Sequence, residues 1–217
     1  MTAVQEFLKA PPLTVSMDDI RAAFTRPHLP SPHYFTDQQL PEQMPEHKYR
    51  PAAVLIPLFT CPQDDCIKVL LTQRALHMRN HPGQIAFPGG KHDPNDASIQ
   101  YTALRETLEE VGLAPDCFEL LGELHEYCTI SGFCIKPVVA ELTRHSELSL
   151  CRDEVESVHW VPLNYLLNPA NYRTRSKHIG NTERSFLEVE YDGIRIWGAT
   201  AGILCGLYEH LAHYQSL

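Results

Sequence analysis

A short acidic segment in the middle of the chain carries the residues best suited to chemistry. Positions 105 to 113 read Arg-Glu-Thr-Leu-Glu-Glu-Val-Gly-Leu. In a helix of about 3.6 residues per turn, Glu106, Glu109 and Glu110 share one stripe, where like charges three or four residues apart repel each other. Mg²⁺ or Mn²⁺ prefers carboxylate oxygens and would offset this repulsion better than Arg105 alone. We therefore expect these glutamates to bind a divalent metal ion.

The other flank of this predicted helix carries larger apolar side chains. Their spacing predicts a core-facing stripe formed by Tyr101, Leu104, Leu108 and Val111. An ordinary solvated acidic face would give the same short string of glutamates, so the residues upstream decide between the two interpretations.

Glycines and cations precede the predicted helix. Without side chains, Gly89 and Gly90 allow the backbone to approach a ligand closely, although simple turn glycines are the alternative. Arginine is the better bidentate reader of phosphate, although any of the nearby cations could equally be a surface charge. The predicted substrate-binding residues are Arg74, Arg79, Gly89, Gly90 and Lys91.

The acidic segment resembles the Nudix box, the signature of enzymes that hydrolyse a nucleoside diphosphate linked to another group. The matching residues are Arg105, Glu106, Glu109, Glu110, Gly112 and Leu113. Thr107 replaces the usual aliphatic residue, and Asp96 replaces the usual early glutamate in a segment that is one residue longer than the common box. Loops tolerate insertions, so the extra residue leaves the role of Asp96 open but not that of the helix.

A second resemblance narrows the family. Residues 70 to 90 resemble the extended motif that precedes the Nudix box in coenzyme A diphosphatases. The matching residues are Leu70, Leu71, Thr72, Arg74, Ala75, Arg79, Gly83 and Phe87 through Gly90. Residues 153–155, 160–163 and 197–203 also resemble bacterial members, so the likeness spans roughly residues 50 to 210.

The resemblance implies metal-dependent cleavage of coenzyme A, and of its acyl esters, into 4′-phosphopantetheine and adenosine 3′,5′-bisphosphate. Such hydrolysis needs charge neutralisation and an aligned water more than a protein nucleophile. Glu106 and Glu110 are the expected principal metal ligands and Glu109 a further ligand, while Arg105 would orient a carboxylate. The general base is left open between Glu106 and Glu154. The predicted catalytic residues are therefore Arg105, Glu106, Glu109 and Glu154.

Two other functions stay open at this point. One is hydrolysis of another nucleoside diphosphate derivative, such as ADP-ribose or NADH, because the box reports the diphosphate and not its substituents. The other is a non-catalytic nucleotide-binding module on the same fold. Three clustered acids disfavour that module, since binding alone would not require them.

Composition limits the class of protein. A chain of 217 residues is long enough for one compact domain. Its formal charge of −9 argues against a nucleic-acid-binding surface, and its longest apolar run is too short to span a membrane comfortably. Seven scattered cysteines without a C-x-x-C pair indicate neither a disulfide framework nor a zinc site. We expect a cytoplasmic protein with a small-molecule substrate, with a homodimer as a possible assembly.

Apolar runs and turn signals predict the order of elements. Residues 1–50 are predicted to form a helical start and an extended arm that packs on a Nudix domain of residues 51–217. Expected strands lie at 52–59, 67–74, 118–127, 135–142, 156–160, 183–191 and 194–197, with a hairpin turn at Asp192-Gly193. Expected helices lie at 4–9, 17–24, 99–111, 163–167 and 199–214. Strands between helical layers predict an α/β fold with a mixed sheet, and the resemblance implies the Nudix α/β/α sandwich.

Overall fold

A mixed eight-stranded sheet forms the centre of the computed structural model, which describes residues 3–25, 49–144, 146–179 and 182–216. The strands are β1 (Arg50–Thr60), β2 (Ile67–Arg74), β3 (Ile85–Ala86), β4 (Gly89–Lys91), β5 (Phe118–Glu123), β6 (Tyr127–Cys128), β7 (Phe133–Leu142) and β8 (Val155–Pro162). The main order is β3-β2-β1-β7-β5, with β4 on β1, β6 on β7 and β8 on β2. Strands β1 and β7 are parallel and the other pairs antiparallel, which confirms the predicted mixed sheet.

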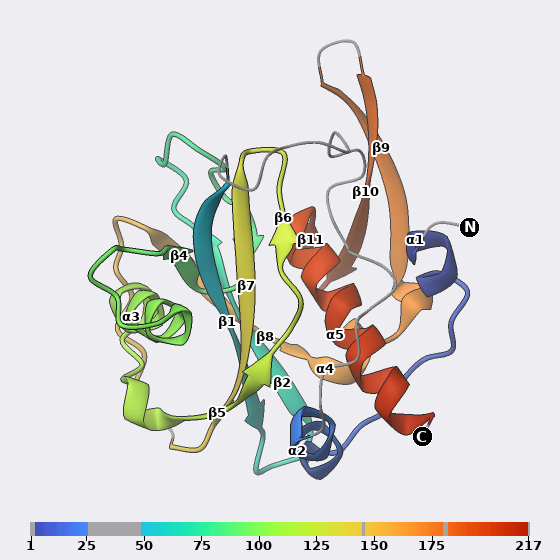
Figure 1. Cartoon of the computed structure of the whole chain (residues 1–217), viewed down its shortest axis with the longest axis horizontal. Coiled ribbons are helices and arrows are strands. Elements are labelled where there is room, and N and C mark those ends of the chain that lie inside the picture. The colour runs from blue at the N-terminus through green and yellow to red at the C-terminus, as the bar shows by residue number, and fades with distance from the viewer. Residues whose placement is uncertain (1–2, 26–48, 145, 180–181, 217) are drawn as a thin grey trace.

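Helices cover both faces of this sheet (Figure 1). The helix α3 (Ile99–Val111) lies on one face, and α5 (Ala199–Gln215) lies on the other. Shorter helices are α1 (Ala3–Phe7), α2 (Met17–Thr25) and α4 (Leu163–Leu166), with single 3₁₀ turns at Pro115–Cys117 and Pro169–Asn171. The described elements thus form the predicted helix-sheet-helix layers. Most of the predicted extended arm lies outside the described residues, and the division at residue 50 stays a prediction.

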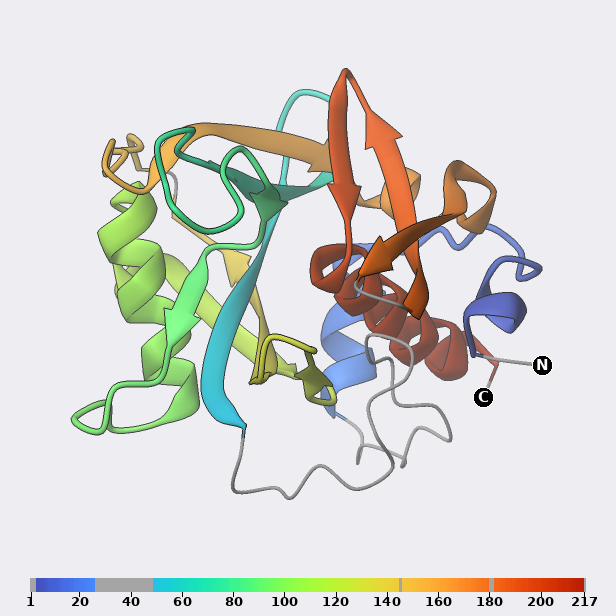
Figure 2. The ribbon, with the colours of Figure 1, turned by 90° about the horizontal axis from the view of Figure 1, so that it is seen from above.

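A second sheet of three antiparallel strands packs on the α5 side (Figure 2). It contains β9 (Tyr172–Ile179), β10 (Thr182–Tyr191) and β11 (Ile194–Trp197). Asp192 and Gly193 have φ values of 46° and 78°, which suits the predicted two-residue hairpin turn. The sequence did not predict β9, because its polar composition lacks the usual signal for a strand. Pairing along β10 supplies its hydrogen bonds instead.

The core on the α5 side depends on one close contact between a helix and a strand. A side chain added at Gly202 of α5 would overlap the Tyr127 ring. The absence of a side chain there lets the helix approach β6 closely.

The predicted core stripe of α3 is wrong in part. Val111 is buried, but Tyr101 is 48% exposed and Leu108 is 42% exposed. Leu104 is partly buried against the core, and the fully buried residues of the helix include, besides Val111, the small or polar Thr102, Ala103, Thr107 and Glu110. The helix is therefore rotated relative to the prediction, and this rotation carries Glu110 inward.

Two cysteines form a disulfide that the sequence did not indicate. Cys128 of β6 and Cys134 of β7 are bonded to each other, at directly paired positions of the two strands. The free cysteines among the described residues are Cys61, Cys66, Cys117, Cys151 and Cys205. The sequence could not show the pair, because its proximity comes from strand register. Of the helices in the described part of the chain, none combines the length and apolarity needed to span a membrane.

Candidate diphosphate and metal site

Two glycines bring the backbone of β4 against the sheet and against α3. Gly89 and Gly90 pair with Val54 and Ala53 of β1. Gly89 has φ of 154°, and a side chain there would overlap the backbone of β1. A Cβ on Gly90 would lie 2.6 Å from the carboxylate oxygens of Glu106. Position 89 therefore requires glycine for space, whereas a side chain at position 90 would displace the Glu106 carboxylate.

Local sequence sets both ends of α3. Ser98 caps the first turn, where its hydroxyl accepts a hydrogen bond from the backbone N–H of Tyr101 at 3.1 Å. Gly112 ends the helix with φ of 78° and donates its N–H to the carbonyl of Leu108. The two ends of the helix therefore fix where its acidic residues lie relative to β4.

The guanidinium group of Arg105 donates hydrogen bonds to three carboxylates. Its Nε and Nη2 donate to the two oxygens of Asp96, each at 2.9 Å, and its Nη1 donates to Glu106 at 2.9 Å and to Glu109 at 3.1 Å. The hydrogen bonds to Asp96 are the main reason that the pKa of Arg105 lies above its ordinary value. The same contact holds the pKa of Asp96 well below its ordinary range. Arg105 therefore stays charged and fixes the orientation of its neighbours.

Asp96 takes a structural part that the sequence left open. Its side chain is only 4% exposed and also accepts hydrogen bonds from the hydroxyl of Thr102 at 2.8 Å and the backbone N–H of Asp93 at 3.1 Å. His92 contacts the same Thr102 hydroxyl through Nδ1 at 2.7 Å. The loop before α3 thus fixes the position of the Arg105 side chain. An acid in that loop was the only signal that the sequence offered for this role.

Glu110 is the most perturbed acid of the site. It is 4% exposed, and burial raises its pKa to about 8, aided by the negative charges of Glu106 and Glu154. The charge of Arg74 and the backbone N–H of Gly89 act in the opposite direction. Its Oε2 atom is buried without a hydrogen-bond partner among the described residues. Burial also raises the pKa of Glu106. Charge at Glu110 is therefore costly unless a cation approaches it.

The donor set fits a divalent cation by its chemistry. Carboxylate oxygens are the ligands that Mg²⁺ and Mn²⁺ prefer, and the unpaired Oε2 of Glu110 offers one. In the described residues, however, no three acidic, histidine or cysteine side chains already surround a common point. Arg105 holds an oxygen of Glu106 and of Glu109. The second carboxylate oxygen of Glu106 and of Glu109 is not held by Arg105, so a cation could bind there while Arg105 keeps its contacts.

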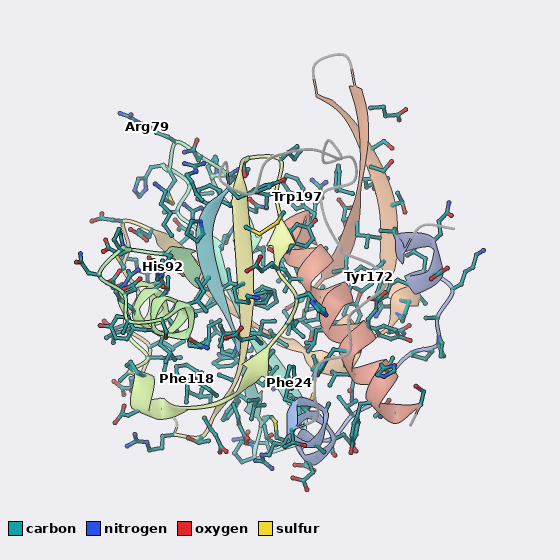
Figure 3. All side chains as sticks on the ribbon, viewed as in Figure 1. Phe24, Arg79, His92, Phe118, Tyr172 and Trp197 are labelled. Atoms are coloured by element: carbon teal, nitrogen blue, oxygen red, sulfur yellow. A yellow bond between two sulfur atoms is a disulfide. The ribbon has the colours of Figure 1, made fainter. Side chains whose placement is uncertain are left out.

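The other predicted site residues differ in how close they lie to the acids of α3. The charge of Arg74, at the end of β2, acts on Glu110, and the charge of exposed Glu154 acts on both Glu106 and Glu110. Lys91 is exposed, and its carbonyl accepts a hydrogen bond from Arg105. Arg79 extends outward from its loop (Figure 3). The geometry thus gathers Arg74, Glu154 and the helix acids, whereas Arg79 stands apart.

Comparison with known proteins gives the class of this chain. Residues 48–180 match the NUDIX domain, which is more than half of the sequence. The chain therefore belongs to the Nudix family and is an enzyme that hydrolyses phosphoric anhydride bonds of nucleoside diphosphate derivatives. Nudix hydrolases generally use divalent metal ions, and their substrates are small nucleotides.

The chain is similar to a Nudix hydrolase relative and, more distantly, to solved structures. A protein of Salmonella typhimurium named "Uncharacterized Nudix hydrolase NudL" is 39% identical over 176 residues, which cover 79% of this chain and 90% of that protein. Among solved structures, a MutT/nudix family protein from Enterococcus faecalis is 19% identical with a TM-score of 0.49, covering 93% of this chain and 76% of the other. A C. elegans Ap4A hydrolase is 22% identical with a TM-score of 0.44, covering 52% of this chain and 80% of the other.

Proposed function

We propose that this Nudix hydrolase cleaves the diphosphate of coenzyme A and its acyl esters into 4′-phosphopantetheine and adenosine 3′,5′-bisphosphate. The observation that carries the proposal is that two segments with separate family resemblances lie close together. Arg74 belongs to the segment that resembles the coenzyme A diphosphatase motif, and its charge acts on Glu110 of the Nudix helix. The first segment also contains Gly90, which lies against the carboxylate of Glu106 in the second segment.

The proposed roles follow from charge and position. Glu106, Glu109 and Glu110 would hold Mg²⁺ or Mn²⁺, which when bound neutralises charge on the phosphoryl oxygens. Arg105 orients Glu106 and Glu109, and its own position is fixed by Asp96. A general base must lie near the attacked phosphorus, and Glu106 and Glu154 both remain candidates because their charges interact.

Substrate contacts are proposed at the surface beside these acids. The backbone at Gly89 and Gly90 would approach the diphosphate, and Arg74, Arg79 and Lys91 would supply cations. In a protein with a formal charge of −9, such local cations are needed to meet an anionic ligand. A cytoplasmic location, where coenzyme A derivatives are abundant, is part of the same proposal.

Product analysis tests the proposal directly. The purified chain is incubated with Mg²⁺ and separately with coenzyme A, dephospho-coenzyme A, ADP-ribose and NADH, and the products are separated by chromatography. We expect adenosine 3′,5′-bisphosphate from coenzyme A at a kcat/KM at least about tenfold above those for ADP-ribose and NADH. The Glu110→Gln variant, purified identically, controls for contaminating phosphatases. Faster cleavage of ADP-ribose or NADH would transfer the assignment to that substrate, and no turnover of any substrate would favour a binding module.

A further inference from the structure

The outer face of the second sheet carries charged and aromatic residues that the diphosphate site leaves unused. Leu187, Val189 and Ile196 of this sheet are buried in the core that includes α5. Side chains alternate along a strand, so the residues between them face away from that core. We define the arginine–aromatic cluster on this face as Arg175, Phe186, Glu188, Arg195 and Trp197.

A buried carboxylate fixes two arginines in the cluster. Glu188 is 4% exposed at its side chain and accepts hydrogen bonds from Nε of Arg175, at 3.2 Å, and from Nε of Arg195. Both arginine side chains are about half exposed, at 52% and 50%. Burial opposes ionisation of Glu188, but the two guanidinium groups outweigh it and keep its pKa below the ordinary value. With Arg173 opposite Glu188 and Glu190 opposite Arg195 on the same face, three cations meet two anions, which leaves a net positive charge.

The hydrogen bonds leave much of each guanidinium group available. Both contacts to Glu188 use Nε, and the Nη groups of Arg175 and Arg195 have no hydrogen-bond partner in the part of the chain that the structure describes. A guanidinium group held in place loses less freedom when it binds an anion than a mobile one does. The two Nη pairs therefore form a preorganised set of donors.

Aromatic rings border these donors. The guanidinium carbon of Arg195 lies 5.4 Å from the centre of the Trp197 ring and 6.0 Å from that of Phe186. The ring centres are 5.3 Å apart, and both side chains are partly exposed. Aromatic faces beside arginine suit the planar base of a nucleotide, while guanidinium groups suit its phosphate.

Arg195 and Trp197 of the cluster lie on β11, which leads directly into α5. After Trp197, Gly198 turns the chain with φ of 64°, and the next helix begins. The hydroxyl of Thr200 donates to the carbonyl of Ile85 at 3.2 Å, a few residues before the glycine strand β4. Figure 3 shows Trp197 near the N-terminal end of α5. The hydrogen bond of Thr200 thus ties the start of α5, next to Trp197, to β3 near the proposed reaction site.

We propose that the arginine–aromatic cluster binds a phosphorylated nucleotide, with the phosphate on Arg175 and Arg195 and the base against Trp197 or Phe186. The choice of nucleotide rests on the proposed function, whose nucleotide product is adenosine 3′,5′-bisphosphate. That product carries a 3′-phosphate on its ribose, and this phosphate is not part of the diphosphate that is cleaved.

Isothermal titration of the full chain tests this inference without turnover. Adenosine 3′,5′-bisphosphate, adenosine and inorganic phosphate are titrated separately into wild type, Arg175→Gln, Arg195→Gln and Trp197→Leu in the presence of a chelator. We expect each variant to bind the bisphosphate at least about tenfold more weakly than wild type. Arg144→Gln is the matched control, because Arg144 is also exposed and paired with one carboxylate, that of Asp116. This control should bind like wild type.

Three results would overturn the inference. They are bisphosphate affinities within about twofold of wild type in both arginine variants, equal affinity for inorganic phosphate and the bisphosphate, and an equal loss in Arg144→Gln. If circular dichroism shows that Arg195→Gln does not fold, Arg195→Lys replaces it. Lysine keeps the positive charge but lacks the paired N–H donors of a guanidinium group, so this variant must still weaken binding. Binding is measured directly, so the cluster is tested even if the chain does not cleave coenzyme A. Normal cleavage with unchanged binding in the variants would reject the cluster alone.

Discussion

Replacing Glu110 with glutamine should make the metal-free protein more stable while removing most of its activity. The substitution keeps the shape of the side chain and removes a charge that lies 4% exposed with an unpaired oxygen. A buried charge without a partner is costly, but the same charge would attract the metal ion. Stability and activity should therefore change in opposite directions.

The pKa gives the size of the stability change. Burial raises the pKa of Glu110 from 4.5 to about 8, and one pKa unit corresponds to about 1.4 kcal/mol. The folded protein then holds a proton that the unfolded chain releases, so stability falls as the pH rises from 4.5 toward about 8. Near pH 7 the cost is roughly 3 kcal/mol. Glu110→Gln should recover most of it at neutral pH and little below about pH 4.5.

Denaturation in urea with a chelator present measures this effect at several pH values. Glu119→Gln is the matched control, because Glu119 is an exposed glutamate on β5 and its replacement should leave both stability and activity unchanged. In parallel, kcat with Mg²⁺ should fall by at least about 10²-fold in Glu110→Gln. Added Mg²⁺ should stabilise wild type and not the variant.

Two outcomes would refute the reasoning. If Glu110→Gln is no more stable than wild type near pH 8, and shows the same dependence on pH, burial does not oppose the charge as argued. If its turnover is close to that of wild type, Glu110 is not a metal ligand. The two results are independent, because one is measured without metal and the other with it.

Three further substitutions test the surroundings of these acids. Arg74→Gln should lower kcat/KM at least about tenfold for coenzyme A and dephospho-coenzyme A alike, because its charge acts on Glu110; a loss confined to coenzyme A would place Arg74 at the 3′-phosphate instead. Gly90→Ala should lower kcat at least about tenfold in steady-state assays, because its methyl group would lie 2.6 Å from oxygens of Glu106; an unchanged kcat would mean that this carboxylate need not keep its place. Asp96→Asn should melt below wild type at neutral pH, and the difference should shrink as the pH falls below 3.8, since the depressed pKa stabilises the fold only while Asp96 is ionised. Thermal melts across that range that stay parallel would contradict this prediction.

The sequence alone determined the elements whose signals lie within a few residues. The predicted helix at 99–111 matches α3, because its cap at Ser98 and its stop at Gly112 are local. The same holds for β11 and its hairpin turn at Asp192 and Gly193, where backbone preference acts within two residues. Residue types also sufficed to group the acids, since their spacing follows from helix geometry.

The tertiary structure alone decided the orientation and environment of those acids. Periodicity placed Tyr101 and Leu108 inward, but the helix instead turns its small residues Ala103 and Thr107 to the sheet. This permits close approach, and Thr107 satisfies its hydroxyl on the carbonyl of Ala103 at 2.7 Å. The rotation carries Glu110 into the interior, where desolvation changes its pKa. No local pattern reports that burial, because it depends on contacts between segments far apart in the chain.

The contacts of Arg105 and the existence of β9 were decided in the same way. Asp96 reaches Arg105 because the loop before α3 folds back, which residue spacing does not specify. Strand β9 has little apolar signal of its own and forms because β10 supplies hydrogen-bond partners along its length. Hydrogen bonds and charge interactions of this kind depend on distance in space, whereas sequence patterns report only distance along the chain.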